Sequence, residues 1–333
     1  MQQEAAQEGG SVLQRHSYQE LFTRYSGNPI IQGLDMPYPV NAVFNPGATM
    51  VKGETLLLMR VEDRQGISHF AAARSRDGFS DWRIDPVPTL LPDPRTYPQE
   101  TWGIEDPRIT FLEHERTWTV AYTGYSKAGP VVCLATTKDF KHFERIGAVM
   151  PPENKDAALF PVQFSGRWAM LHRPVPTFTG VGAHIWLSFS PDMRHWGDHQ
   201  MVIQARTGGW WDADKIGLSP PPLWTEKGWL VMYHGVKTTA GGCIYRVGLV
   251  LLDPNDPTRV LARSSRWAFG PEAGYEVTGD VDKVVFPCGW VRQGDEIRLY
   301  YGAADKCIAV ATARVSEMLA WLRDTETACE DVV

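Results

Sequence analysis

Two adjacent carboxyl side chains, Glu105 and Asp106, lie between a glycine and a proline in the segment GIEDPR at 103–108. One interpretation is structural, because carboxylates in turns commonly accept hydrogen bonds from backbone amides. The other is catalytic, because a rigidly held carboxylic acid can donate its proton to the oxygen of a bond being cleaved, such as a glycosidic bond. Trp102 directly precedes the pair, and its indole could stack on a sugar ring.

A second group of candidates is basic and is spread over four motifs. Its members are Lys155 in ENKDAALFP, Arg173 in LHRP, Lys215 in DADKIGLSPPP and His234 in MYHGV. Taken singly, Lys155 could be a surface lysine and Lys215 an ion-pair partner of Asp212 or Asp214. If the fold brings the four together, they would bind a small anion, and phosphate is the first candidate because arginine and lysine donors suit its oxygens. An acid beside phosphate would suggest phosphorolysis.

A repeated pattern of two short strands could position these side chains. The copies begin with ETLLLMRVED, RTWTVAYTGYS, GRWAMLHRP, GWLVMYHGVK and DEIRLYYGAAD, and each is followed by a second strand-like run. The first four copies end in a turn with an aspartate, and these turn residues, Asp77, Asp139, Asp192 and Asp253, are about 53 to 62 residues apart. That period is close to the length of a propeller blade.

The repeat predicts an all-β fold, a five-bladed β-propeller, with four strands in each blade. A helix is expected only over 315–326, where Met318, Leu319 and Leu322 form one apolar stripe. We expect a flexible tail over 1–15 and a single catalytic domain over 16–333. A pair of β-sandwiches is the competing architecture.

In a propeller, the ends of the inner strands meet on one face, where ligands commonly bind. We assign the first strand of each copy to this inner position, so the polar residues at its end should converge there. They are Arg60, Asp63, Tyr122, His172, Arg173, Tyr233, His234, Tyr301 and Asp305. Any one of them alone could be an ordinary solvated strand end.

Composition narrows the class of protein. The chain has 333 residues with 43% hydrophobic and 22% charged residues, which fits a soluble globular protein rather than a disordered one. Its net charge of −6 argues against a nucleic acid partner. Its five scattered cysteines form no CxxC pair, so we expect neither disulfides nor a metal site.

With neither a signal sequence nor a membrane span expected, we predict a cytoplasmic protein without a membrane partner. Thirteen Trp, 11 Tyr and 30 Gly suit a β-rich sugar-binding protein.

Ten motifs in order make the sequence resemble glycoside hydrolase family 130, the β-mannoside phosphorylases with a five-bladed propeller. They are RYSGNPI, AVFNPGA, RVED, GIEDPR, NKDAALFP, LHRP, KIGLSPPP, YHGV, GDVDKVVFPCG and YYGAAD. The resemblance implies that Asp106 is the general acid and that Lys155, Arg173, Lys215 and His234 bind phosphate. It also implies a mannose site, to which we assign Asn45, Arg60, Asp63, Glu105 and Asp305.

The resemblance further implies inversion by a single displacement, with phosphate as co-substrate, no other cofactor and α-mannose 1-phosphate as product. The proton of Asp106 would reach the leaving oxygen through the mannose 3-hydroxyl. Many members acting on mannosyl-glucose or mannosyl-N-acetylglucosamine have arginine in an NRNG context where this chain has Lys155 in NKDA. The combination of NKDAALFP with EDPR more closely resembles the members that act on β-1,2-linked mannosides. A mannoside hydrolase on the same fold, an arabinanase-like hydrolase and a non-catalytic sugar-binding propeller remain alternatives. Linkage, acceptor and homo-oligomer formation stay open.

Overall fold

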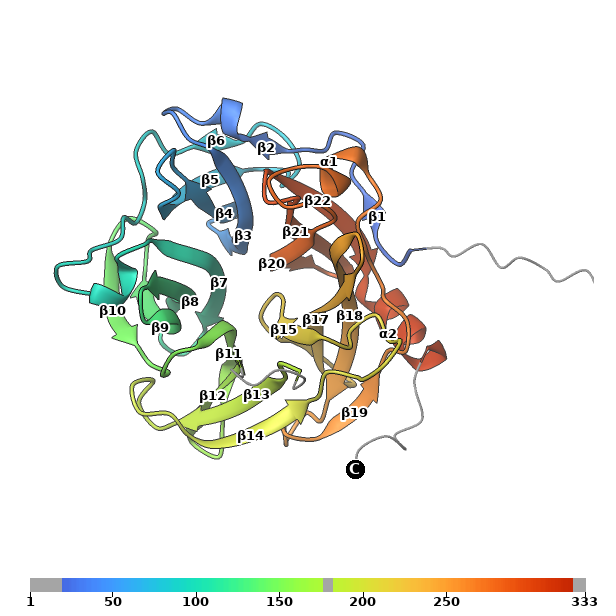
Figure 1. Ribbon diagram of the computed structural model, residues 1–333. Helices are drawn as coiled ribbons and strands as arrows, with labels where there is room; N and C mark the ends of the chain where they lie inside the picture. The colour runs from blue at the N-terminus through green and yellow to red at the C-terminus, as the bar shows by residue number, and fades with distance from the viewer. Residues whose placement is uncertain (1–19, 176–181, 326–333) are drawn as a thin grey trace, which may run out of the picture.

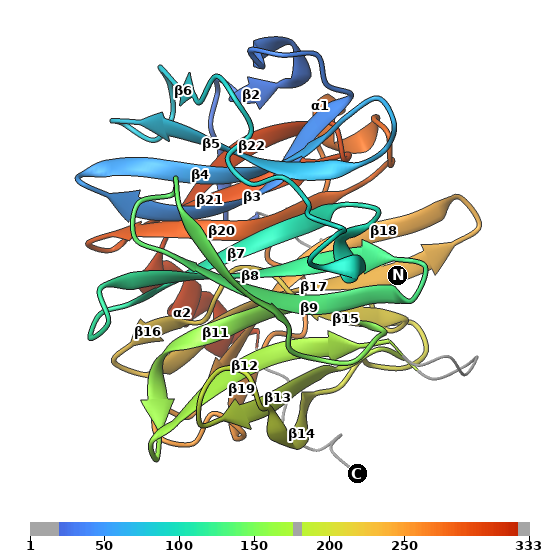
Figure 2. The ribbon, with the colours of Figure 1, turned by 90° about the vertical axis from the view of Figure 1, so that its left-hand side faces the viewer.

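The computed structural model describes residues 20–175 and 182–325, and the predicted tail at 1–15 lies outside the described residues. Five antiparallel sheets surround a common centre, as Figure 1 shows from one end of the ring and Figure 2 from its side. This arrangement confirms the five-bladed β-propeller, and the expectation of two β-sandwiches as an alternative is wrong.

The first three blades each contain four strands that follow one another from the centre outwards. Blade 1 consists of β3 (Ala42–Val51), β4 (Glu54–Glu62), β5 (Ser68–Ser75) and β6 (Arg83–Ile84). Blade 2 consists of β7 (Ile104–Leu112), β8 (Thr117–Ser126), β9 (Gly129–Thr137) and β10 (Phe143–Ala148). Blade 3 consists of β11 (Asn154–Phe164), β12 (Arg167–Pro174), β13 (Ile185–Ser190) and β14 (Gly197–Ile203).

The inner strand of blade 4 is divided by the prolines of SPPP at 219–222 into β15 (Lys215–Leu218) and β16 (Leu223–Thr225). Both halves pair with β17 (Gly228–Thr239), and β18 (Gly242–Leu252) and β19 (Val260–Arg263) complete the blade. Short helical turns lie in the loops, namely η1 (Gly33–Asp35), η2 (Pro98–Glu100) and α1 (Gly274–Val277).

Blade 5 joins the two ends of the described chain. Its strands β20 (Val285–Gln293), β21 (Glu296–Ala303) and β22 (Cys307–Arg314) come from the C-terminal part. The outer edge of β22 pairs with β1 (Thr23–Arg24) and β2 (Ile31–Gln32), which come from the N-terminal part. The ring is therefore closed by backbone hydrogen bonds between the first and last strands.

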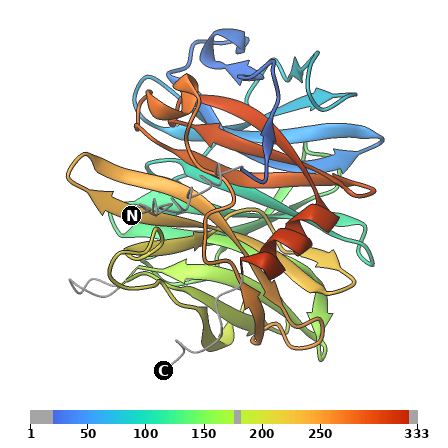
Figure 3. The ribbon, with the colours of Figure 1, turned by 90° about the vertical axis from the view of Figure 1, so that its right-hand side faces the viewer.

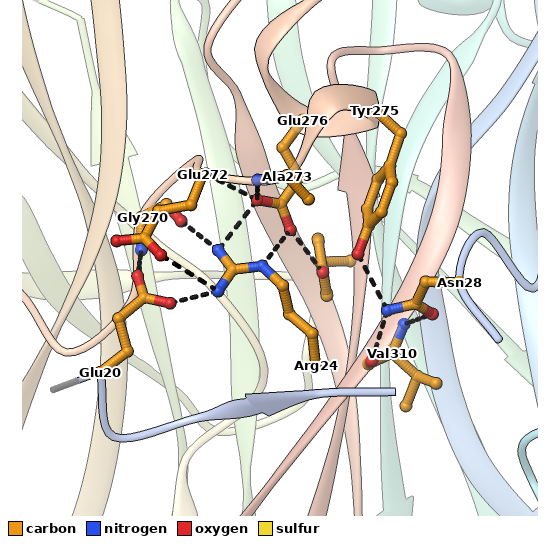
Figure 4. A network of polar contacts seen from close by, with 10 residues as sticks. Glu20, Arg24, Asn28, Gly270, Glu272, Ala273, Tyr275, Glu276 and Val310 are labelled. Atoms are coloured by element: carbon orange, nitrogen blue, oxygen red, sulfur yellow. Dashed lines mark hydrogen bonds and ion pairs between the residues drawn. The ribbon is translucent and has the colours of Figure 1, made fainter. Parts of the chain in front are cut away.

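A buried ionic network strengthens this closure (Figure 4). The fully buried carboxylate of Glu276 accepts hydrogen bonds from Arg24 Nε at 2.8 Å and Arg24 Nη2 at 2.9 Å. It also accepts bonds from the Tyr301 hydroxyl at 2.7 Å and from the backbone amides of Glu272 and Ala273. Arg24 on β1 is thereby tied to the loop that enters blade 5.

Apolar side chains fill the space between neighbouring blades. Leu57 and Val61 of blade 1, for example, share a buried cluster with Tyr300 and Val310 of blade 5. The predicted C-terminal helix is confirmed as α2 (Val315–Asp324), which lies outside the ring in Figure 3. Its predicted stripe also packs inwards, with Met318 and Leu322 buried and Leu319 half-buried.

The four turn aspartates of the repeat have one local role. Each of them accepts hydrogen bonds on Oδ1 from backbone amides two and three residues further along the chain, and they are Asp77, Asp139, Asp192 and Asp253. They begin equivalent turns after the third strand of blades 1 to 4. No helix among residues 20–175 and 182–325 has the length and apolar content needed to cross a membrane.

The assignment of the repeat to inner strands is wrong. The first strand of each copy is the second strand of its blade, namely β4, β8, β12, β17 or β21. The true inner strands precede the copies, and they contain segments such as FNPG and EDPR that resemble turns. Proline and asparagine are uncommon inside regular strands, which is why the sequence pattern did not indicate strands there.

Candidate active site

The inner strands of the first three blades share a bulge that aims one polar residue away from the regular strand. The register shifts between Phe44 and Gly47 in β3, and the equivalent shifts lie after Glu105 in β7 and after Lys155 in β11. The bulged residues adopt left-handed backbone conformations, with φ of 45° at Asn45, 52° at Asp106 and 53° at Asp156. Asparagine and aspartate tolerate this conformation better than other side chains with a Cβ.

Asp106 lies at the centre of the first group of contacts. The residue is 2% exposed, and its Oδ1 accepts hydrogen bonds from Asn45 Nδ2 at 2.9 Å and Arg60 Nη1 at 3.1 Å. Burial alone would raise the pKa of Asp106, but the positive charges of Arg60, Lys155 and Arg108 outweigh burial and lower it. The structure therefore joins Asn45, Arg60 and Asp106 as the sequence predicted.

Arg60 is the organising cation of this group. Its Nη2 donates to Glu105 Oε1 at 3.0 Å, its Nε donates to Ser68 Oγ at 3.0 Å, and its guanidinium lies 4.6 Å from the centre of the Phe44 ring. These contacts hold both carboxylates of the EDPR segment next to blade 1.

Asp305 belongs to the same group, and Asp63 does not contact it. Burial raises the pKa of Asp305 to about 6, although the charge of Arg60 opposes the rise, and Asp106 and Glu105 contribute to it. Asp63 instead accepts backbone hydrogen bonds from Gln65 at 2.7 Å and Ile67 at 3.0 Å in the turn after β4. Its role in holding mannose stays a prediction.

The four predicted basic residues lie around the bulge of blade 3, at Asp156. Arg173 donates from Nε and Nη2 to Asp156 Oδ2 at 2.9 and 2.6 Å. Burial lowers the pKa of Lys215, and the nearby charges of Arg173 and Lys155 lower it further. His234 Nε2 lies 3.5 Å from the same Asp156 oxygen. The fold thus concentrates positive charge in one place, as an anion site requires.

His234 is enclosed by the protein. Its Nδ1 lies 3.4 Å from Ser219 Oγ, its Nε2 faces Asp156, and burial lowers its pKa to about 4. The ring is therefore neutral at pH 7. Gly217 leaves room for both side chains, because the Cβ of any other residue there would collide with the Asp156 carboxylate and the His234 ring.

Four other residues at the ends of the second strands do not belong to the site. Tyr122, Tyr233 and Tyr301 donate hydrogen bonds to Glu100, Asp212 and Glu276. His172 lies between Asn154 and Ser188, and burial lowers its pKa to about 3. These polar groups stabilise buried parts of the blades instead of reaching the ligand face.

Two charged residues of the site were missed from the sequence, namely Arg108 and Asp156. Arg108 is fully buried, and its Nη2 donates to Asp156 Oδ1 at 3.3 Å. The signal that would have found them is the alignment of FNPG, EDPR and KDAA, which occupy the same bulge in three blades. Trp102 is 45% exposed and lies edge-on to Tyr125, at 5.3 Å between ring centres.

The family described as beta-1,4-mannooligosaccharide phosphorylase, glycoside hydrolase family 130, matches residues 12–324. The chain belongs to glycoside hydrolase family 130. The resemblance seen in the motifs is therefore confirmed over nearly the whole length. Among the described residues of this family 130 chain, no cluster of three histidine, cysteine or acidic side chains could hold a metal ion.

Known relatives of this family 130 chain align along almost their whole length. A 1,2-beta-oligomannan phosphorylase of Thermoanaerobacter is 34% identical, with 89% of this chain and 98% of the relative covered. A beta-1,4-mannooligosaccharide phosphorylase of Ruminococcus albus is 32% identical, with 91% of each chain covered. The solved structure of a beta-1,2-mannobiose phosphorylase from Listeria innocua, in complex with beta-1,2-mannobiose, is 32% identical with a TM-score of 0.83, covering 91% of this chain and 99% of that chain.

Proposed function

We propose that the protein is an inverting β-mannoside phosphorylase, a hexosyltransferase that uses inorganic phosphate to release α-mannose 1-phosphate from a β-mannosyl disaccharide or oligosaccharide. The observation that carries the proposal is the buried carboxyl of Asp106 beside the cations around Asp156. Two of the three relatives named above act on β-1,2-linked mannosides by name, and β-1,2-linked mannobiose is therefore the first substrate to test.

The mannosyl unit would occupy the group of residues around Arg60. In this proposal Asn45, Arg60, Asp63, Glu105 and Asp305 contact its hydroxyl groups. Because Asn45 and Arg60 also donate to Asp106, substrate binding and orientation of the acid depend on the same two side chains. A sugar that displaces either donor would therefore change the position of the acid.

Phosphate would bind to Lys155, Arg173, Lys215 and His234, on the face of the sugar opposite the leaving group. A phosphate oxygen attacks C1, and the bond between C1 and the glycosidic oxygen breaks with inversion. The proton of Asp106 passes to the leaving oxygen through the mannose 3-hydroxyl. Because phosphate is itself the nucleophile, no second carboxylate is needed as a base.

Phosphate binding would also prepare the acid. The charges of Arg60 and Lys155 favour the ionised form of Asp106, whereas a general acid must carry a proton. A phosphate dianion beside Lys155 offsets that positive charge, so the pKa of Asp106 rises when phosphate binds. Protonation of the acid would then be coupled to the presence of the co-substrate.

The proposal extends to the surroundings of the enzyme. It acts in the cytoplasm on small soluble mannosides and phosphate, needs no metal or organic cofactor, and has neither a nucleic acid nor a membrane partner. Phosphate is consumed as a substrate in every turnover.

The test is incubation with β-1,2- and β-1,4-linked mannobiose and mannotriose, with and without inorganic phosphate. We expect α-mannose 1-phosphate and the shortened sugar only when phosphate is present, and ³¹P and ¹H NMR identify both products. Free mannose formed at the same rate without phosphate would make the protein a hydrolase. Sugar binding without any turnover would make it a non-catalytic binding protein.

A further inference from the structure

We propose that Asp156 is the positioning residue of the phosphate site, which holds the Arg173 guanidinium in the orientation that receives the anion. The inference rests on the proposed function in one respect, since it assumes that the cations around Asp156 bind phosphate. It assigns a function to a buried carboxylate that neither binds the sugar nor supplies the proton.

The first observation concerns the Arg173 guanidinium. Two of its three nitrogens, Nε and Nη2, donate to Asp156 Oδ2 at 2.9 and 2.6 Å. An arginine side chain has considerable rotamer freedom, which binding would otherwise have to restrict. Asp156 restricts it before phosphate arrives and leaves the Nη1 edge of Arg173 for the anion.

The second observation is that Asp156 is itself held from the other side. Its Oδ1 accepts from Arg108 Nη2 at 3.3 Å, and Arg108 also donates to the backbone carbonyl oxygens of Asp106 at 3.1 Å, Leu218 at 2.9 Å and Ser219 at 3.2 Å. These bonds connect the inner strands of blades 2, 3 and 4. Through Asp156 and Arg108, the orientation of Arg173 is thereby fixed relative to β7, the strand that carries Asp106.

The third observation concerns His234. Its Nε2 lies 3.5 Å from Asp156 Oδ2 and its Nδ1 lies 3.4 Å from Ser219 Oγ, so the ring packs against the same carboxylate that holds Arg173. Asp156 accepts hydrogen bonds but cannot donate them when ionised, so the ring proton belongs on Nε2. The close packing of both side chains against Gly217 fixes the carboxylate in this geometry.

The sign of one substitution separates positioning from simple electrostatics. A negative charge beside an anion site opposes phosphate binding, so if Asp156 acted only through its charge, Asp156→Asn would tighten binding. If Asp156 positions Arg173, the same substitution weakens binding, because asparagine keeps one carbonyl oxygen as acceptor and turns an amide donor towards the second arginine. The two interpretations therefore predict opposite changes.

We would measure the Kd of inorganic phosphate by calorimetry, together with kcat/KM for phosphate and KM for the mannoside. For Asp156→Asn we expect the phosphate Kd to rise about tenfold to a hundredfold, as for the loss of one charge-assisted bond, and the mannoside KM to stay within about twofold. Asp156→Glu keeps the charge but displaces the carboxylate, so phosphate binding should weaken there too.

The matched control is Asp212→Asn. Asp212 is another buried carboxylate bonded to two arginines, accepting from Arg206 at 3.0 Å and Arg263 at 2.7 Å, but it does not contact the candidate site residues described above. This variant should lose thermal stability and keep its phosphate Kd. This variant shows how the loss of a buried ionic cluster outside the phosphate site changes stability and phosphate binding.

An unchanged or lower phosphate Kd in both Asp156 variants would overturn the positioning role. If the unmodified protein binds phosphate without cleaving mannosides, the proposed function fails while the titrations still decide the role of Asp156. If it binds no phosphate, the anion site and this inference both fail.

Discussion

Replacing Asp106 with asparagine should remove the proton donor and leave the site otherwise intact. Both hydrogen bonds to this carboxylate, from Asn45 Nδ2 and Arg60 Nη1, arrive at Oδ1. The carbonyl oxygen of an asparagine can occupy that position and accept both bonds. Because general acid catalysis contributes about a hundredfold to ten-thousandfold in rate, kcat should fall by that factor, or by about 2.7 to 5.4 kcal/mol in activation free energy.

The assay is release of α-mannose 1-phosphate from β-1,2-mannobiose at saturating phosphate, repeated with β-mannosyl fluoride. Fluoride leaves without a proton donor, so Asp106→Asn should lose far less activity on the fluoride than on mannobiose. Glu105→Gln is the matched comparison, because its carboxylate bonds the same arginine through Nη2. As a mannose-binding residue and not the acid, it should lose activity equally on mannobiose and on the fluoride. For Asp106→Asn, a loss below about tenfold on mannobiose, or equal losses on both substrates, would refute the assignment of the acid.

Three further changes test other parts of the molecule. Arg173→Ala should lower kcat/KM for phosphate by about tenfold to several thousandfold, for the loss of one or two charge-assisted bonds, while the mannoside KM changes little; titration of both substrates checks this. Arg24→Met leaves the buried Glu276 carboxylate without its cation (Figure 4), so the free energy of unfolding should fall by about 3 kcal/mol or more in urea denaturation. Arg83→Met, which removes an exposed ion pair, should change the free energy of unfolding little. The pKa of Asp305 is raised to about 6, so between about pH 4 and 6 the folded state holds a proton there that the unfolded state does not, and the free energy of unfolding falls as the pH rises through that window. Asp305→Asn should therefore raise the melting temperature at pH 7.5 and barely change it at pH 4.

The fold could be predicted because the repeat is marked by local chemistry. Each turn aspartate bonds two amides within its own turn, and such a motif depends on no distant residue. The C-terminal helix was equally visible, because its apolar stripe follows the helical period. Local patterns of this kind can be recognised in a single sequence.

The inner strands and part of the site could not be predicted in the same way. A bulge at Asn45 or Asp156 interrupts the alternation of apolar and polar residues that marks a strand. The function of Asp156 depends on Arg108 from another blade and on Arg173 from the next strand, and no sequence spacing reveals these contacts. The three tyrosines at strand ends were misassigned because their hydroxyl partners are buried carboxylates from loops or short helical turns.

Closure of the ring by β1 and β2 sets an order of events during protein synthesis. These strands leave the ribosome first, yet their partner β22 is made only after all the other blades. Blades 1 to 3 can form from consecutive hairpins as they emerge, whereas blade 5 needs both ends of the described chain. Until β22 is released, the N-terminal strands have no sheet to join. A shortened chain that lacks β1 and β2 would keep an open strand edge on β22, where other chains can pair.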